Sequence, residues 1–95
     1  MQKLEIVMSE AIDNDFLHRC DVRGIAQHYT KVENVYGKGN QNPKLGNEVW
    51  PQVNVHYMIV VRDEEVEPIK MVINSLRRDF RDDGIACFIS PCEEL

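Results

Sequence analysis

Apolar and other residues alternate along residues 3–9, KLEIVMS, which is the two-residue period of a β-strand. The spacing then changes to that of an amphipathic helix, predicted to start at Asp13 or Asn14, either of which can cap it, and to run to about Val22. Gly24 follows as the residue that ends the helix, because glycine adopts a positive φ without strain. The apolar stripe of this helix consists of Phe16, Leu17 and Cys20.

The second half of the chain repeats this succession of strand, helix and strand. Residues 25–36 are rich in β-branched and aromatic side chains and predict a second strand, and residues 53–61, VNVHYMIVV, predict a third. Asp63 is predicted to cap a second helix, and the charges of its acidic first turn, DEEVE, suit the positive end of a helix. Its apolar stripe consists of Val66, Ile69, Ile73, Leu76 and Phe80. Residues 85–90 predict a last strand, which Pro91 stops.

The order of these elements, βαββαβ, predicts an α+β fold of the ferredoxin-like type. Right-handed crossovers place both helices on one face of a four-stranded antiparallel sheet. The 95 residues suffice for one domain with a single core, spanning residues 1–95.

The opposite face of this sheet is half apolar, although a solvated sheet face normally alternates to polar residues. An apolar patch of this kind more often marks an interface than a free surface. We therefore expect a homo-oligomer assembled through this face. The residues predicted to lie on it are Glu5, Val7, Asn54, His56, Met58, Val60, Ala86 and Phe88.

A polar segment without hydrophobic period, residues 37–52, joins the second strand to the third. Connections of this length without secondary structure are usually functional or disordered. The glycine, asparagine and lysine content of residues 37–48 offers little to pack, so we expect a mobile loop.

The formal net charge of −5 argues against a nucleic-acid partner, which would favour a basic face. Three cysteines without a CxxC spacing predict no disulfide framework and suit a reducing compartment. The chain has no apolar run of the ~20 residues that a membrane span needs, and its N-terminus is a poor signal peptide. We expect a cytoplasmic protein that is not inserted into a membrane.

Candidate binding residues gather around the loop. The backbone amides of Gly37 and Gly39 could hold an anion, with the alternative that these glycines simply open a turn. Lys38 and Lys44 could contact phosphates. Lys44 and Trp50 are expected to belong to a partner-binding loop, with the alternative that Trp50 pins the loop to its own sheet. Three arginines at the end of the second helix could also bind phosphate or simply complement the helix dipole. They are Arg77, Arg78 and Arg81.

Neither a metal site nor a catalytic site is predicted. His18 and Cys20 are two residues apart on a helix and point in different directions, which does not suit chelation. Asp82 and Asp83 are adjacent, which suits a turn better than general acid–base catalysis. Nothing near Cys92 would lower the pKa of its thiol. We expect a non-enzymatic protein without a fixed cofactor.

The segments GIAQHYTKVENVYG and KGNQ resemble the strand and turn that lead into the T-loop of nitrogen-regulatory PII proteins. VWPQVNVHYMIVV, DEEVEPIKMVINSL and RDDGIACFISP are similar to the strand that leaves the T-loop, the second helix, and the B-loop with the last strand. Together they cover nearly the whole chain in the family's order.

This resemblance implies a signalling homotrimer that binds a small anionic metabolite or a nucleotide. The ligand would lie in clefts between the base of one subunit's T-loop, here residues 37–52, and the neighbour's B-loop. Matching positions are Gly37, Lys38, Pro51, Asp83 and Gly84. The T-loop would contact a regulated transporter or enzyme.

Two positions depart from the family pattern. Gln52 and Ile85 stand where the resemblance implies lysines, one of which meets nucleotide phosphates. The loop is short and has no tyrosine between Gly37 and Trp50 to accept a nucleotidyl group. With only about one cation expected at the site, we predict weak ATP binding.

Three other classes stay open on the sequence alone. A trimeric metal-binding protein of the CutA type shares the fold and would respond to Cu(II). An ACT-like ligand-binding module would be a dimer. A small enzyme would turn over a phosphoester or an acyl phosphate.

Overall fold

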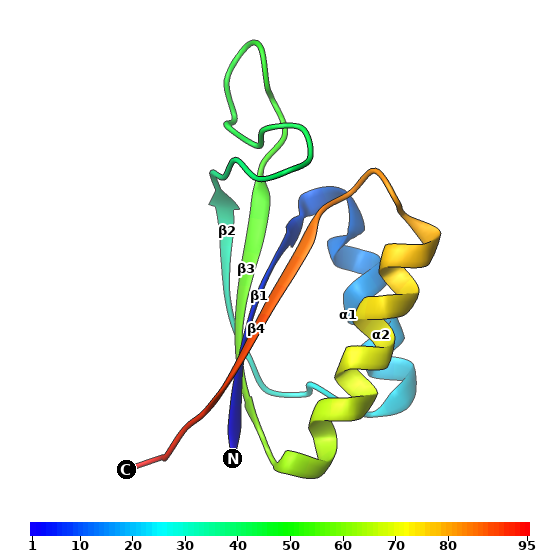
Figure 1. The fold of residues 1–95 in the computed structure, drawn as a ribbon, viewed down its shortest axis with the longest axis vertical. Coiled ribbons are helices and arrows are strands. Elements are labelled where there is room, and N and C mark those ends of the chain that lie inside the picture. The colour runs from blue at the N-terminus through cyan, green and yellow to red at the C-terminus, as the bar shows by residue number, and fades with distance from the viewer.

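The computed structural model describes residues 1–95, and Figure 1 shows a sheet with two helices on one side of it. The four strands are β1 (Gln2–Ser9), β2 (Thr30–Val35), β3 (Asn54–Val61) and β4 (Ile85–Pro91). The two helices are α1 (Asp13–Arg23) and α2 (Val66–Asp79), each preceded by a short 3₁₀ turn, η1 (Glu10–Ile12) and η2 (Asp63–Glu65). The predicted βαββαβ order is confirmed.

All strand pairs are antiparallel, and the sheet order is β2-β3-β1-β4. Across the two central pairings, Glu5 of β1 lies opposite Met58 of β3 on one side and Phe88 of β4 on the other. The first and last strands are therefore neighbours, as expected of a ferredoxin-like sheet. The end of β2 and the start of β3 lie together, and residues 37–52 project beyond them (Figure 1).

The core lies between the sheet and the helices. Alternate residues of the two central strands are buried toward the helices, because the side chains of a strand point to opposite faces in turn. These are Leu4, Ile6 and Met8 of β1 and Val55, Tyr57, Ile59 and Val61 of β3. The helices contribute Phe16, Cys20, Ile69, Val72, Ile73 and Leu76, so the predicted apolar stripes are confirmed in their main positions.

The second strand is shorter than predicted, because it begins at Thr30 rather than at residue 25. Ile25 and Ala26 are buried in the core as part of the connection from α1. Ala26 has a φ of 50°, which is incompatible with an extended strand. β-branched composition alone could not reveal this turn, because Ile25 is buried for its own packing and not as part of a strand.

The helix caps also differ from the prediction. Gly24 ends α1 with a φ of 64°, as expected. Asp13, however, is the first residue of α1 and does not cap it, because its carboxylate accepts hydrogen bonds from Tyr57 and Lys31. Asp63 makes no cap either, and its carboxylate lies 3.4 Å from the N-terminal amino group.

The sheet face away from the helices carries the predicted residues. Met58 is 39% exposed and Phe88 is 66% exposed, so large apolar side chains remain uncovered on this face of the single chain. His56 Nε2 lies 3.8 Å from Glu5 Oε1 on the same face. Neither helix is long and apolar enough to cross a membrane.

Candidate functional site

The loop of residues 37–52 has more internal structure than its composition predicts. Gly37 and Lys44 pair as an isolated antiparallel bridge, with two N–H···O bonds of 2.8 Å. Lys44 is only 5% exposed, and its Nζ donates to Gln52 Oε1 at 2.9 Å. The expectation of a loop with little to pack is therefore wrong for residues 37–44, because backbone pairing and a buried lysine stem close this part.

The second part of the loop is a separate turn. The Gly46 amide donates to Gln52 O at 3.1 Å, and the Asn47 side chain accepts from the amides of Val49 and Trp50. Trp50 is 37% exposed and lies outside the core, so it is not fully pinned to its own sheet. Val49 beside it is also exposed.

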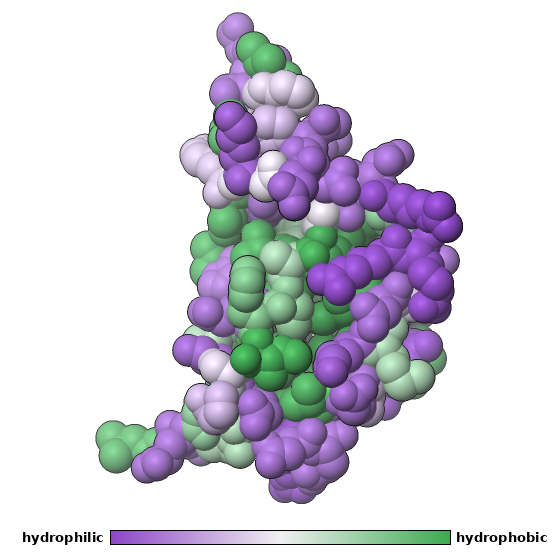
Figure 2. All heavy atoms as spheres, viewed as in Figure 1, coloured by the Kyte–Doolittle hydropathy of each residue, from purple (hydrophilic) through white to green (hydrophobic).

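A hollow of about 560 Å³ lies at the base of this loop and is called the cationic hollow below. It is lined by residues 37–42 and Lys44 of the loop, by Arg77 in the last turn of α2 and Arg81 just after this helix, and by residues 83–86 at the turn into β4. Val7 and Asn54 of the sheet complete the lining. Figure 2 shows hydrophilic side chains gathered over the loop and the adjoining end of α2.

The charge of the cationic hollow is opposite to that of the whole chain. Four cationic side chains line it, and they are Lys38, Lys44, Arg77 and Arg81. Asp83 is the only carboxylate of the lining. None of the four cations forms an ion pair within the chain. Positive charge is thus concentrated in one place on a protein with a net charge of −5.

All five residues predicted to bind the ligand, Gly37, Lys38, Gly39, Asp83 and Gly84, line the cationic hollow. They do so within a single chain, and the expected contribution of a neighbouring subunit to the site stays a prediction. The loop reaches the turn before β4 directly, since a Cβ at Gly84 would lie 3.5 Å from Gln41 Cγ.

Other details of the predicted site are revised. The amide of Gly37 donates to Lys44 O and is not free to hold an anion. The expectation of about one cation is also wrong, because Lys44, Arg77 of α2 and Arg81 just after α2 come to the same hollow. Arg78, by contrast, does not line it. A signal for the arginines was present in the sequence, because α2 leads directly into the turn that carries Asp83.

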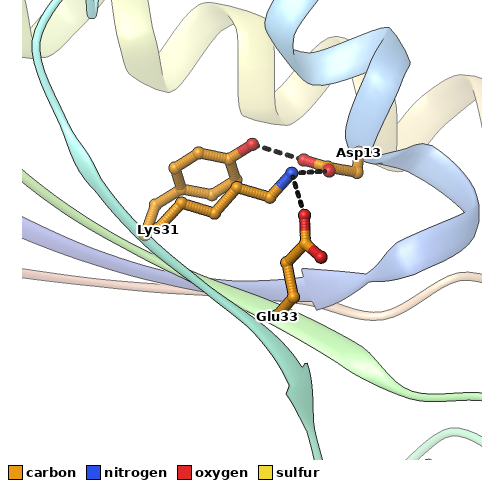
Figure 3. Close-up of polar contacts among 4 residues, drawn as sticks. Asp13, Lys31 and Glu33 are labelled. Carbon is orange, nitrogen blue, oxygen red and sulfur yellow. Dashed lines mark hydrogen bonds and ion pairs between the residues drawn. The ribbon is translucent and has the colours of Figure 1, made fainter.

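A second polar cluster lies at the start of α1 and is called the Asp13 cluster (Figure 3). Asp13 is 7% exposed and accepts hydrogen bonds from Lys31 Nζ of β2 and Tyr57 Oη of β3. Glu33 Oε1 lies 3.4 Å from the same ammonium. The hydrogen bond to Asp13 raises the pKa of Lys31, and burial raises the pKa of Tyr57. This cluster ties α1 to β2 and β3.

No group of three or more His, Cys, Asp and Glu side chains comes together to hold a metal ion. The three cysteines are free. Burial raises the pKa of the Cys20 thiol to about 11 and also raises the pKa of Cys87, so both remain protonated and weakly nucleophilic at neutral pH.

No protein-family model and no curated protein matches the chain. Solved structures of PII-like proteins do match it. CPII, a nitrogen regulatory PII-like protein from Thiomonas intermedia K12, bound to ADP, AMP and bicarbonate, is 23% identical with a TM-score of 0.73. The alignment covers 94% of this chain and 82% of CPII.

Two further structures support the same fold. CPII bound to ADP, AMP and acetate has a TM-score of 0.68 at 19% identity, over 98% of this chain and 88% of that one. A protein from Thermus thermophilus described as a PII-like signalling protein has a TM-score of 0.59 at 14% identity, over 94% and 83%. The chain therefore has the ferredoxin-like fold of PII-like signalling proteins, and the resemblance inferred from its sequence is confirmed for the fold.

Proposed function

We propose that this protein is a non-enzymatic regulator of the PII-like kind. It binds a small anionic metabolite or a nucleotide in the cationic hollow and acts on a transporter or an enzyme through residues 37–52. The observation that carries this proposal is the placement of four unpaired cations at the base of that loop. A ligand there contacts the loop directly and can change its position.

The similar structures support the choice of ligands. CPII is found with ADP, AMP, bicarbonate and acetate, which are all anions or carry anionic groups. A cluster of unpaired cations on an acidic chain suits the same class of ligand, and this holds most for Lys44, because a buried cation is costly unless it is paired. The loop also exposes Val49 and Trp50, which offer a partner protein an apolar contact.

A thermal-shift screen tests the ligand. We expect ADP, AMP or bicarbonate to raise the unfolding temperature, because a ligand at 100 times its Kd stabilises the folded state by about 2.7 kcal/mol. Cu(II) serves as the comparison for a metal-binding protein and adenosine for an uncharged ligand. A shift with Cu(II) alone would contradict the proposal and favour a protein of the CutA type.

The proposal includes a homotrimer formed through the open sheet face. Met58 lies in the middle of this face, where Glu5 of β1 separates it from Phe88 of β4. Met58→Lys places a cation there and should dissociate the assembly. Met71→Lys is the matched control, because Met71 is equally apolar and is exposed on α2 at 68%. Light scattering should give a trimer for the wild type and for Met71→Lys, and a monomer for Met58→Lys. A wild-type monomer at micromolar concentration would overturn this part of the proposal.

A further inference from the structure

Two cations of the cationic hollow are held by neutral acceptors only. Lys44 Nζ donates to the amide oxygen of Gln52 at 2.9 Å, and Arg77 Nη2 donates to the carbonyl of Ile85 at 3.0 Å. Arg77 Nη1 also lies 3.4 Å from Asn74 Oδ1. These contacts fix the direction of both side chains and leave their charges uncompensated.

Lys44 gives the strongest indication of a missing partner. Its ammonium has three N–H donors, and a single one finds an acceptor in the protein, although the residue is only 5% exposed. A buried charge is normally paired with an opposite charge. An anion in the cationic hollow, which Lys44 lines, would supply that partner.

The positions of the two contacts are also informative. Gln52 and Ile85 are the residues that stand where lysines are expected from the resemblance to PII proteins. Lys44 is bonded to the first and Arg77 to the second. At each of the two positions where a lysine is missing, a cationic side chain from another part of the chain thus makes contact instead.

We propose that Lys44 and Arg77 bind the phosphate groups of a nucleoside mono- or diphosphate in the cationic hollow. This inference rests on the proposed function and names the ligand and the residues that select it. Lys44 belongs to the loop and Arg77 to α2, so one phosphate ligand joins both elements. Binding draws residues 37–44 against the end of α2 and couples the ligand to the shape of the loop.

Charge balance favours a phosphate over a singly charged anion. Four cations and one carboxylate line the hollow. A phosphate monoester carries about −1.5 to −2 charges at pH 7, and a second phosphate adds about one more. Bicarbonate compensates one charge and leaves the others unpaired. Asp83 opposes the ligand, so Asp83→Asn should strengthen binding.

Calorimetry with ADP and AMP on matched variants tests the inference. Lys44→Met keeps the buried stem and removes the charge, and Arg77→Gln removes the guanidinium. Each should raise the Kd for ADP by about tenfold or more, because each removes a charge-assisted hydrogen bond. Arg78→Gln is the control, since it removes the same charge from the same turn of α2 but does not line the hollow. Its Kd should stay within about twofold of the wild type.

Three further ligands identify the group that is recognised. Adenosine should bind at least about tenfold more weakly than ADP, since it lacks the phosphates, and inorganic pyrophosphate should compete with ADP. Adenosine that binds as tightly as ADP, or pyrophosphate that does not compete, would overturn the inference. Bicarbonate that binds more tightly than ADP and AMP would overturn it too.

The two levels of the proposal fail in different ways. If the wild type binds no nucleotide and no bicarbonate, the proposed function itself is wrong. If the wild type binds ADP and the variants Lys44→Met and Arg77→Gln bind it as Arg78→Gln does, only the inference is wrong. If circular dichroism shows that a variant does not fold, the salt dependence of ADP binding by the wild type is the test instead. The Kd of the wild type for ADP should rise severalfold between about 0.02 M and about 0.2 M NaCl.

Discussion

Lys31 and Lys44 are two lysines largely withdrawn from solvent, and the chain treats their charges in opposite ways. The ammonium of Lys31 lies between the carboxylates of Asp13 and Glu33 in the Asp13 cluster (Figure 3). The ammonium of Lys44 meets only the neutral amide of Gln52 in the cationic hollow. The first charge is compensated inside the protein, and the second is not.

This difference separates a structural cluster from a binding site. A charge compensated within the fold contributes to stability and is not available to a ligand. A charge held only by neutral acceptors costs free energy in the empty protein. This cost is recovered when an anion binds. The Asp13 cluster therefore fixes α1 on the sheet, whereas the cationic hollow is prepared for an anion at the expense of stability.

The largest expected effect comes from breaking the Asp13 cluster. Asp13→Ala leaves the Lys31 ammonium and the Tyr57 hydroxyl without their shared acceptor, so the free energy of unfolding should fall by about 3 kcal/mol. Denaturation in urea measures it. Asp15→Ala is the control, because Asp15 carries the same charge in the same first turn of α1. An equal loss in both variants would mean that the cluster has no special role.

The next effect compares the two lysines directly. Lys31→Met leaves the buried Asp13 without its cation and should cost about 2 kcal/mol, since Tyr57 still donates to it. Lys44→Met loses one hydrogen bond to a neutral acceptor and relieves repulsion among the cations of the hollow, so its cost should stay below about 1 kcal/mol. Urea denaturation of both variants checks this order. The reverse order would remove the distinction between the two sites.

A pH titration sharpens the comparison at the alkaline end. The pKa of Lys31 is raised above its ordinary value of 10.5 by the hydrogen bond to Asp13, so the folded state holds this proton more tightly than the unfolded chain. Its contribution to stability is complete below pH 10.5 and is lost as the pH rises through the raised pKa. The unfolding temperature should fall more steeply above pH 10.5 in the wild type than in Lys31→Met. Parallel curves of unfolding temperature against pH for the two proteins would mean that the loss of stability at alkaline pH does not come from Lys31.

The smallest effect is a spectroscopic one. Trp50 is the single tryptophan and lies in the loop whose base forms the hollow. Addition of ADP should shift or quench its fluorescence in the wild type and in Lys31→Met, but much less in Lys44→Met at the same concentration. If Lys44→Met keeps the full fluorescence response to ADP, the loop does not respond to binding at the hollow.

Much of the fold could be predicted because burial repeats with a regular period. The alternation in β1 and β3 and the helical stripe of α2 were enough to assign the elements and to tell the buried sheet face from the open one. Two of the errors, the long second strand and the Asp13 cap, have one cause. Ile25 and Asp13 both fit a local rule, but each is held by contacts with distant residues instead.

The candidate site was predicted less completely, for a related reason. Gly37, Lys38, Gly39, Asp83 and Gly84 follow from the resemblance, and all of them line the hollow. Lys44 was expected to face a partner, and the arginines were equally consistent with a helix end. Long side chains can reach in many directions, so their position in the chain does not say which charges meet.

The sequence by itself determined the order of the elements, the face of each that is buried, and the length and polarity of the loop. These properties depend on local period and on the burial of apolar area. The tertiary structure alone decided that Lys44 is buried and directed to Gln52 and that Arg77 is directed to Ile85. It also decided that the loop and the end of α2 share one hollow. Such contacts join residues far apart in the chain through polar groups that follow no period, so they exist only once the fold has brought those residues together.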